Sequence, residues 1–374
     1  MNMVRYGMVG CGMMGQEHLR NLAMLPGAEV AAIFEPDAGM RQTSHALAPR
    51  AALVDSLPAL LAHPGLDALV ITSPNHCHAG QLLEIARTSP LPVLMEKPAC
   101  TNLQAATDLW PLASTYPAPV WTAMEYRYMP PIARLVEEAH GQETCGPVVM
   151  LSIREHRYPF LHKVGDWNRF SRNTGGTLVE KCCHFFDLMR LVMQADPIRL
   201  FASGGQNHNH VDERYDGEQP DILDNAYVVL DFPAGRRAML ELCMFAEGSR
   251  YQEEISVVGP RGKIECKVPG PTRFWPAELG EPPVAQLIVS PRQPAGPRML
   301  EIPVDPQLLA AGDHNGSTFY QHQRFMAAVQ QRGPVEVSLA DGLKAVIIGL
   351  AAEHSARTGE RIDLTQGPWR LAAP

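Results

Sequence analysis

The fold of this chain is decided by residues 4–15, which read VRYGMVGCGMMG. Residues 4–9 are mostly apolar, as in a buried strand, and residues 13–24 are typical of a helix that ends before Pro26-Gly27. The glycines between them permit a tight turn (Gly10), close approach of the backbone to phosphates (Gly12) and close helix–strand packing (Gly15). We therefore predict that this turn, including Cys11, Met13 and Met14, binds a dinucleotide pyrophosphate at the helix N-terminus.

A carboxylate at the end of the next strand bears on the choice of cofactor. Glu35 closes a second apolar run, residues 30–34. A carboxylate there can accept hydrogen bonds from both ribose hydroxyls and repels a 2′-phosphate, so the sequence favours NAD over NADP. The alternative is that Glu35 is a solvated residue near the helix cap Asp37.

Strand-like and helix-like runs alternate up to about residue 125. Strands are predicted at residues 67–72, 92–95 and 120–123, and helices at residues 78–87 and 102–113. This alternation is typical of an α/β, doubly wound parallel sheet of the Rossmann type. We assign residues 1–125 to an NAD-binding domain.

The pattern changes in residues 126–374. Longer strand-like runs at residues 148–155, 226–232, 238–245 and 254–258 are interrupted by helical runs at residues 177–194 and 339–358. These runs predict an α+β domain with a large open, mostly antiparallel sheet that binds substrate and mediates oligomerisation. Residues 204–219 are expected to form a polar loop, and the Pro/Gly-rich residues 267–297 to run over the surface.

Composition excludes several classes of protein. The net charge is −8 over 374 residues and the pI is about 6.0, which disfavours nucleic acid as a partner. The chain has no apolar run of membrane-spanning length and no export signal pattern, so we expect a cytoplasmic protein away from the membrane. Its eight cysteines are scattered, and the adjacent Cys182, Cys183 and His184 cannot easily point at one tetrahedral ion, so no metal is expected.

Candidate catalytic groups follow a strand and lie on a helix. Lys97 comes after the strand at residues 92–95, at the edge where open α/β sheets bind ligands. Glu180 and His184 are four residues apart, so a helix would place both on one side. Oxidation of a secondary alcohol needs a base for the hydroxyl proton, and we predict Lys97, His184 and Glu180 as the catalytic residues. The alternatives are a solvated lysine, a structural core histidine and a glutamate that only forms a salt bridge.

The chain resembles the Gfo/Idh/MocA oxidoreductases at Gly10–Gly15, at Glu96-Lys97-Pro98 and from Gly175-Gly176 to Asp187. The resemblance implies an NAD-binding domain, a second domain with an open sheet, and nicotinamide in the cleft between them. It also implies a cofactor-binding or domain-crossover position for a further set of residues: Ser73, Pro74, Asn75, His78, Glu96, Glu125 and Arg127. The chain departs from the family pattern where Glu180 replaces an aspartate and Cys182 a glycine, and these two positions bear on the choice of substrate.

Substrate contacts are expected from a cationic stretch and from a polar cluster. The ring of Trp167 suits a sugar face, and the cations Arg154, His156 and Arg169 suit a carboxylate or sulfonate on that sugar. A solvated charged loop is the alternative. His314 opens a later helix and, by the resemblance, reaches the substrate. Further substrate contacts are expected from Lys97, Arg127, Glu180 and His184.

Three functions remain open from the sequence. The first is NAD-dependent oxidation or reduction of a secondary alcohol of a sugar, sugar acid or cyclitol. The second is an oxidoreductive glycosidase that recycles tightly bound NAD through oxidation, elimination, water addition and re-reduction. The third is a non-catalytic NAD-binding regulator. By analogy, we expect a homodimer or homotetramer.

Overall fold

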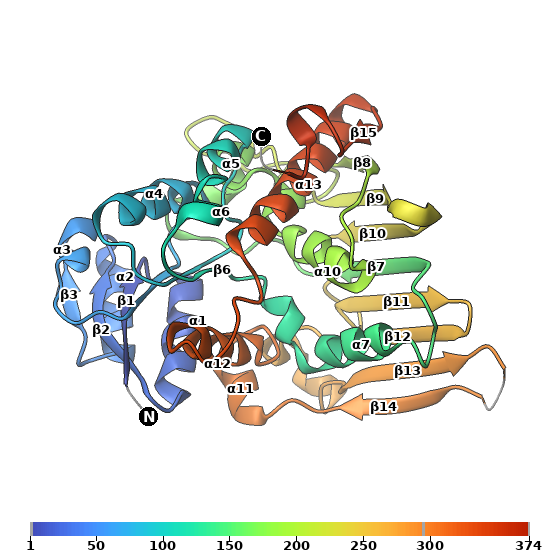
Figure 1. Cartoon of the computed structure of the whole chain (residues 1–374), viewed down its shortest axis with the longest axis horizontal. Coiled ribbons are helices and arrows are strands. Elements are labelled where there is room, and N and C mark those ends of the chain that lie inside the picture. The colour runs from blue at the N-terminus through green and yellow to red at the C-terminus, as the bar shows by residue number, and fades with distance from the viewer. Residues whose placement is uncertain (1–2, 294–295, 373–374) are drawn as a thin grey trace.

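The computed structural model describes residues 3–293 and 296–372 and contains two sheets (Figure 1). The first sheet has six parallel strands in the order β3-β2-β1-β4-β5-β6, which is the doubly wound order expected. Its strands are β1 Val4–Val9, β2 Ala28–Phe34, β3 Ala52–Val54, β4 Ala68–Ile71, β5 Val93–Met95 and β6 Val120–Thr122. The strand order reverses between β1 and β4, and ligands bind at such a point in open α/β sheets.

Helices connect these strands. They are α1 Met13–Met24, α2 Ala38–Leu47, α3 Leu57–Leu61, α4 His78–Thr88, α5 Leu103–Leu109 and α6 Leu112–Thr115, with the short 3-10 turns η1 Asn75–Cys77 and η2 Glu125–Tyr128. Asp37 caps α2 by accepting a hydrogen bond from Met40 N at 2.9 Å, as its sequence position predicts. The single helix predicted at residues 102–113 is divided into α5 and α6, since Pro111 lacks the N–H that would continue the first helix.

The second sheet has nine strands in the order β14-β13-β12-β11-β7-β10-β9-β8-β15. Its pairings are antiparallel except for that between β7 and β10, which is parallel. The strands are β7 Met150–His156, β8 Arg199–Gly205, β9 Asn225–Asp231, β10 Arg237–Cys243, β11 Glu253–Gly259, β12 Gly262–Val268, β13 Ala285–Pro291, β14 Arg298–Ile302 and β15 Ile362–Asp363.

The expectation that residues 267–297 only run over the surface is wrong for part of this segment. β13 lies inside the sheet between β12 and β14, and Leu287 and Val289 on this strand are buried. Their alternation with polar neighbours identifies a half-buried strand, which the prolines and glycines on either side obscured. Residues 294–295 of the segment lie outside the described residues.

The helical run predicted at residues 177–194 is also divided in two. The amides of Lys181 and Cys182 both donate to Thr177 O, so the regular ladder stops there. The helices of this part of the chain are α7 Pro130–Gly141, α8 Ser171–Thr174, α9 Thr177–Glu180, α10 Cys183–Met193, α11 Pro306–Ala311, α12 Ser317–Val329 and α13 Leu339–Thr358, and its 3-10 turns are η3 Val164–Arg169, η4 Pro233–Gly235, η5 Thr272–Phe274, η6 Ala277–Leu279 and η7 Gly367–Trp369.

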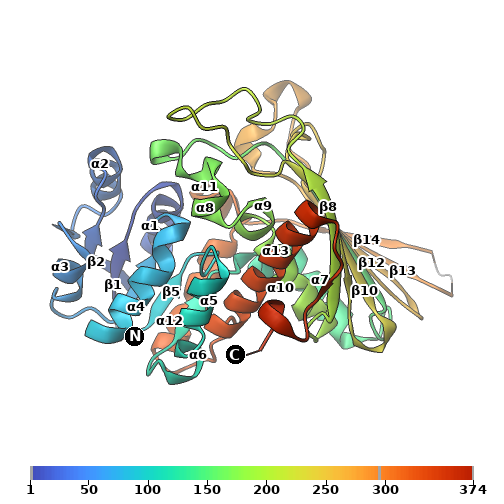
Figure 2. The same ribbon diagram turned by 90° about the horizontal axis from the view of Figure 1, so that it is seen from above.

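Helices from the second part of the chain fill the space between the two sheets. Figure 2 shows α10 and α13 on the side of the large sheet that faces the first sheet. α12 returns to pack against α1, and its Phe325 joins the core around Tyr6 and Trp121. The outer face of the large sheet exposes Phe201, Tyr227 and other apolar side chains. Among the described residues, no helix has the length and apolar character needed to cross a membrane.

Candidate active site

A cleft of about 720 Å³ lies where α1, the chain after β5 and the loop after β7 come together. Met13, Met14 and Glu17 line it from α1, and Lys97 lines it from the end of β5. Its other lining side chains include Tyr126, Arg157, Tyr158, Lys163, Glu180, Lys181, His184, Arg273, Asp313 and His314. The predicted catalytic residues therefore share one cavity with the N-terminus of α1.

The glycine turn has the shape that a pyrophosphate requires. Gly10 has φ +81°, and a Cβ there would lie 2.7 Å from Ser73 Cα. A Cβ on Gly15 would lie 2.7 Å from Thr72 Oγ1, whereas one on Gly12 would meet no described atom within 4 Å. Gly12 is the N-cap of α1, and no side chain of the described residues caps this helix start. The first amides of α1 thus face open space, which fits a bound phosphate group.

Glu35 is fixed beside this turn. Its Oε2 accepts a hydrogen bond from Cys11 N at 2.5 Å and its Oε1 accepts one from Asp37 N at 2.8 Å. The carboxylate is buried at the end of β2. Each oxygen has a further lone pair, so the group can still accept hydrogen bonds from a ribose.

The chain after β4 carries Ser73, Pro74, Asn75 and His78. His78 is fully buried, with Nδ1 2.8 Å from Pro98 O and Nε2 2.9 Å from Ser73 O. Burial lowers the pKa of His78. His78 therefore connects the chain after β4 to the chain after β5. Asn75 Nδ2 is buried and has no partner among the described residues.

Two residues at the end of β5 point in different directions. Glu96 is buried, and its Oε1 lies 2.9 Å from His18 Nε2. Burial would raise the pKa of Glu96, but the hydrogen bond with His18 and nearby positive charges bring it below its ordinary value. Lys97 Nζ donates to the carbonyl oxygen of Glu180 at 3.1 Å, which directs the ammonium group to the cleft.

Glu180 ends α9 and His184 lies in the first turn of α10, and both line the cleft. Glu180 Oε1 accepts a hydrogen bond from Lys163 Nζ at 3.3 Å. Glu180 Oε2 and His184 Nδ1 are buried, and neither has a partner within residues 3–293 and 296–372. Buried polar atoms are normally hydrogen-bonded, so these two favour a ligand that brings polar groups into the cleft.

The His184 side chain is held as a neutral imidazole. Its pKa lies well below the ordinary value, because the ring is buried and because Lys97, Lys181, His314 and Arg157 carry positive charge nearby. A neutral imidazole retains one nitrogen lone pair and can accept a proton.

A second buried network lies at the α1 side of the cleft. His314 Nδ1 lies 2.8 Å from Glu17 Oε1. Burial opposes the charge of each partner, but their attraction dominates, with the pKa of His314 raised to about 9 and that of Glu17 lowered to about 2. They form an ion pair at neutral pH.

Thr318 connects this pair to Glu125. Its Oγ1 lies 2.8 Å from Glu17 Oε1 and 3.1 Å from Glu125 Oε2. A hydroxyl has one proton to donate, so a second hydrogen bond requires a proton on one of the carboxyl groups. Burial raises the pKa of Glu125 to about 7, so Glu125 is the carboxyl group that holds this proton below neutral pH.

Two family models together match most of the chain. The model for the "Oxidoreductase family, NAD-binding Rossmann fold" matches residues 4–124, and that for the "Oxidoreductase family, C-terminal alpha/beta domain" matches residues 141–364. The chain belongs to the Gfo/Idh/MocA family of oxidoreductases. The resemblance and the fold class inferred from the sequence are confirmed.

Relatives of this Gfo/Idh/MocA oxidoreductase align over nearly its whole length. It is 24% identical to a myo-inositol 2-dehydrogenase of Thermotoga maritima over 366 residues, 97% of this chain and 99% of the relative. The structure of an oxidoreductase from Agrobacterium radiobacter in complex with NAD+, L-tartaric acid and magnesium has a TM-score of 0.78 at 18% identity, over 96% of this chain and 98% of that chain. A levoglucosan dehydrogenase in complex with NADH and levoglucosan has a TM-score of 0.77 at 18% identity, over 97% and 100% of the two chains. These structural likenesses show the fold.

Several predicted substrate residues of this Gfo/Idh/MocA oxidoreductase lie away from the cleft. Arg154 and His156 point to the outer face of the large sheet, where they pair with Glu254 and Glu241. Arg169 is buried against Glu213, with Nε 3.1 Å from its carboxylate.

Arg127 and Trp167 also have structural contacts. Arg127 forms a bidentate pair with Asp187, at 2.5 Å for each contact, and so joins the crossover η2 to α10. The ring of Trp167 contacts Lys163, whose Nζ lies 4.5 Å from the ring centroid. The structure does not bring Arg127 or Trp167 into the lining of the cleft.

Glu155, Tyr126 and Lys181 form a buried cluster that was not among the site residues predicted from the sequence. Glu155 is buried, and its Oε1 lies 2.8 Å from Lys181 Nζ, which also donates to Tyr126 Oη at 2.5 Å. For Glu155, the alternation along residues 148–155 could have predicted burial. It places Leu151, Ile153 and Glu155 on the inward face of the strand and Arg154 on the outward face.

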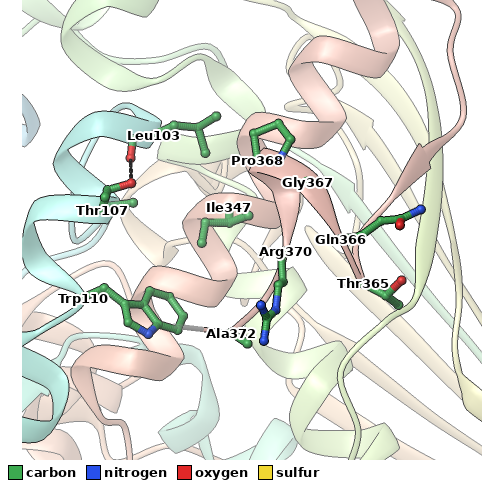
Figure 3. Close-up of a pocket in the computed structure, with 11 residues that line it drawn as sticks. Leu103, Thr107, Trp110, Ile347, Thr365, Gln366, Gly367, Pro368, Arg370 and Ala372 are labelled. Atoms are coloured by element: carbon green, nitrogen blue, oxygen red, sulfur yellow. Dashed lines mark hydrogen bonds between the residues drawn. The ribbon is translucent and has the colours of Figure 1, made fainter. Parts of the chain in front are cut away.

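A separate hollow of about 340 Å³ lies between α5, α13 and the chain after β15 (Figure 3). Trp110, Ile347 and Pro368 give it an apolar lining, with Arg370 at its side. It contains none of the predicted site residues of this oxidoreductase.

Proposed function

We propose that the protein transfers hydride between NAD and a secondary alcohol of a carbohydrate or cyclitol, with Lys97 and His184 as the acid–base pair. The observation that carries this proposal is the convergence of Lys97, Glu180 and His184 on a cleft that also contains the N-terminus of α1. Catalytic groups of different elements that meet beside a phosphate-binding turn support oxidoreductase chemistry at this position.

The cofactor would be held by residues 10–15 and by Glu35. The open position at Gly12 and the uncapped start of α1 fit the pyrophosphate. Glu35 supports NAD over NADP because its buried carboxylate would meet a 2′-phosphate with like charge. When bound, the nicotinamide supplies the hydride acceptor or donor.

The side chains around the reacting carbon would handle the proton. Neutral His184 can accept the hydroxyl proton of an alcohol, and Lys97 can donate a hydrogen bond to the same oxygen and stabilise its developing negative charge. Glu180 Oε2 can accept a hydrogen bond from a neighbouring hydroxyl of the substrate. A polyol would thus satisfy both unpartnered atoms of the cleft.

We also propose that copies of the chain associate through the outer face of the large sheet. Phe201, Tyr227 and Val229 expose between 42% and 56% of their surface on the neighbouring strands β8 and β9, where Phe201 lies opposite Val229. Exposed apolar side chains on adjacent strands are typical of a subunit interface.

The test is to add NAD+ and a panel of sugars, sugar acids and cyclitols to the purified chain and follow nicotinamide absorbance. We expect a rise with at least one alcohol and its loss in Lys97→Met. Normal turnover by Lys97→Met would remove the proposed mechanism. Release of the aglycone from a chromogenic glycoside with no net NADH would indicate an oxidoreductive glycosidase. Absence of any turnover, together with tight binding to a protein partner, would indicate a regulator.

A further inference from the structure

The cleft is positively charged in a chain whose net charge is −8. Its lining contains six Lys or Arg side chains against three Asp or Glu: Arg20, Lys97, Arg157, Lys163, Lys181 and Arg273 against Glu17, Glu180 and Asp313. Protonated His314 adds to this excess. Focused positive charge in a cleft raises the local concentration of anions. Binding of the cofactor phosphates would explain positive charge near α1. The cations that follow β7 need a separate explanation.

Arg157 is a poorly paired cation of this cleft wall. Its side chain is 12% exposed, and the nearest carboxylate oxygen, Glu155 Oε1, lies 3.7 Å from Nη1. Nε donates to Tyr158 O at 3.1 Å, and the guanidinium stacks 4.4 Å from the Tyr158 ring centroid. Neither terminal nitrogen of Arg157 donates a hydrogen bond within the described residues. A nearly buried guanidinium on a cleft wall thus keeps two donor groups unused.

The carboxylates behind Arg157 cannot neutralise it. Glu155 is already engaged by Lys181 at 2.8 Å. Glu253 lies directly opposite Glu155 in the pairing of β11 with β7, and both side chains are buried. Burial and the adjacent Glu155 raise the pKa of Glu253 to about 8, so Glu253 is uncharged at neutral pH. One negative charge therefore serves two cations.

The other cations of the cleft do not remove the excess of positive charge around Arg157. Lys163 is matched by Glu180 and Arg273 by Asp313. Lys97 contacts a carbonyl oxygen and has no carboxylate partner in the described part of the chain. The part of the cleft lining formed by residues 157–163 therefore carries net positive charge, and Arg157 is close enough to His184 to depress its pKa.

We propose that the substrate is a sugar acid whose carboxylate is bound by the terminal nitrogens of Arg157, in the same cleft as Lys97 and His184. This inference rests on the proposed function for the identity of the reacting alcohol. The carboxylate site itself is inferred from the contacts of Arg157 alone. A planar guanidinium with two free donors matches a carboxylate in bidentate geometry, and Tyr158 fixes its plane.

The experiment compares acids with their neutral counterparts on the NADH-saturated protein. Calorimetric titration with D-gluconate, D-glucuronate, D-glucose and myo-inositol is carried out on the wild type, Arg157→Gln, Arg157→Lys and Arg134→Gln. Arg134 lies on the exposed surface of α7, paired with Glu137 and Glu138, and serves as the matched control. We expect Arg157→Gln to weaken binding of the acids by about 10- to 100-fold and to leave binding of the neutral compounds unchanged. Arg157→Lys should show a smaller loss, because it keeps the charge without the bidentate fork.

The results separate this inference from the proposed function. Tighter binding of neutral compounds than of acids by the wild type, or equal loss of both classes in Arg157→Gln, would overturn the carboxylate site. If Arg157→Gln does not fold, the test uses Arg157→Lys and the salt dependence of binding to the wild type. Only the affinity for acids should fall as salt is added. NADH formation from neutral alcohols alone would leave the proposed function intact and refute the sugar acid. Acid binding through Arg157 with no NADH formation from any alcohol would refute the function and keep the site.

Discussion

The ring of His184 stacks on the ring of Tyr126, with centroids 4.2 Å apart and an angle of 11° between their planes. The stack covers one face of the imidazole, and both residues line the cleft. Tyr126 Oη in turn accepts a hydrogen bond from Lys181, so the stack also brings a positive charge close to His184. The geometry and the protonation state of His184 are thus set by the same neighbours.

This arrangement predicts an unusual pH profile. Protonated His184 cannot act as a base, and its lowered pKa means that kcat/KM should not fall as the pH is lowered through 6.5, the ordinary value for histidine. Lys181→Gln removes one of the nearby positive charges while keeping a donor for Tyr126 and Glu155. The pKa of His184 should then rise, and the acid limb of kcat/KM should move to higher pH. Lys263→Gln, on β12 with its side chain 42% exposed, should leave the limb in place. An acid limb near 6.5 in the wild type would contradict this account.

Lys97→Met should abolish turnover without loss of the cofactor. We expect kcat to fall by about 100- to 10,000-fold, the usual contribution of a positioned proton-transfer group. NAD binding, measured by quenching of tryptophan fluorescence, should change little, because residues 10–15 are untouched. Lys263→Met provides the surface control. A parallel loss of cofactor affinity in Lys97→Met would assign Lys97 to binding rather than catalysis.

Glu125→Gln should make the protein relatively more stable as the pH rises. The folded-state pKa of Glu125 is about 7, above the ordinary 4.5, so the wild type loses stability as the pH rises from 4.5 through 7 and this carboxyl ionises in a buried site. Glutamine imitates the protonated form and does not ionise. The difference in unfolding free energy between variant and wild type should therefore shift in favour of the variant by roughly 1–3 kcal/mol between pH 5 and pH 8. Urea unfolding at both pH values measures it, with exposed Glu137→Gln as control. An unchanged difference would show that Glu125 is already ionised at pH 5.

The sequence predicted the first sheet well because its signals are local. Each buried parallel strand is a short apolar run that ends in a glycine or a polar turn, as at Gly10 and Glu96. The division of residues 177–194 depends instead on tertiary contacts, since the buried Lys181 reaches Tyr126 and Glu155 from the break. Neither partner is near Lys181 in the sequence.

The site was predicted only in part for a similar reason. Lys97 and His184 follow motifs whose spacing is visible in the sequence. Arg154 and His156 were predicted from composition, and the two-residue period of β7 carries them to the outer face while it turns Glu155 inward. Glu17 and Thr318 meet across about 300 residues of chain, and no local pattern connects them.

The outer face of the large sheet should hold subunits together. Tyr227 and Val229 expose 56% and 42% of their surface at the middle of β9, and Figure 2 shows this side of the sheet turned away from the helices. Tyr227→Lys combined with Val229→Lys should reduce the mass measured by light scattering, because charge in an apolar interface is costly to desolvate. Leu279→Lys, 63% exposed but away from the strands, should not. An unchanged mass in the double variant would place the interface elsewhere.

Gly12 and Gly15 should respond differently to the same substitution. A methyl group on Gly15 would lie 2.7 Å from Thr72 Oγ1 and 2.9 Å from Gly10 O, so Gly15→Ala must move the turn and should lower the melting temperature. A methyl group on Gly12 meets open space, so Gly12→Ala should keep the melting temperature of the unliganded protein. It would nevertheless stand where the backbone approaches the pyrophosphate and should weaken NAD binding at least tenfold, by about 1.4 kcal/mol or more. Calorimetry with NAD+ and thermal unfolding without it, run on both variants, distinguish a folding role from a binding role. Wild-type affinity in Gly12→Ala would mean that the dinucleotide does not lie on this turn.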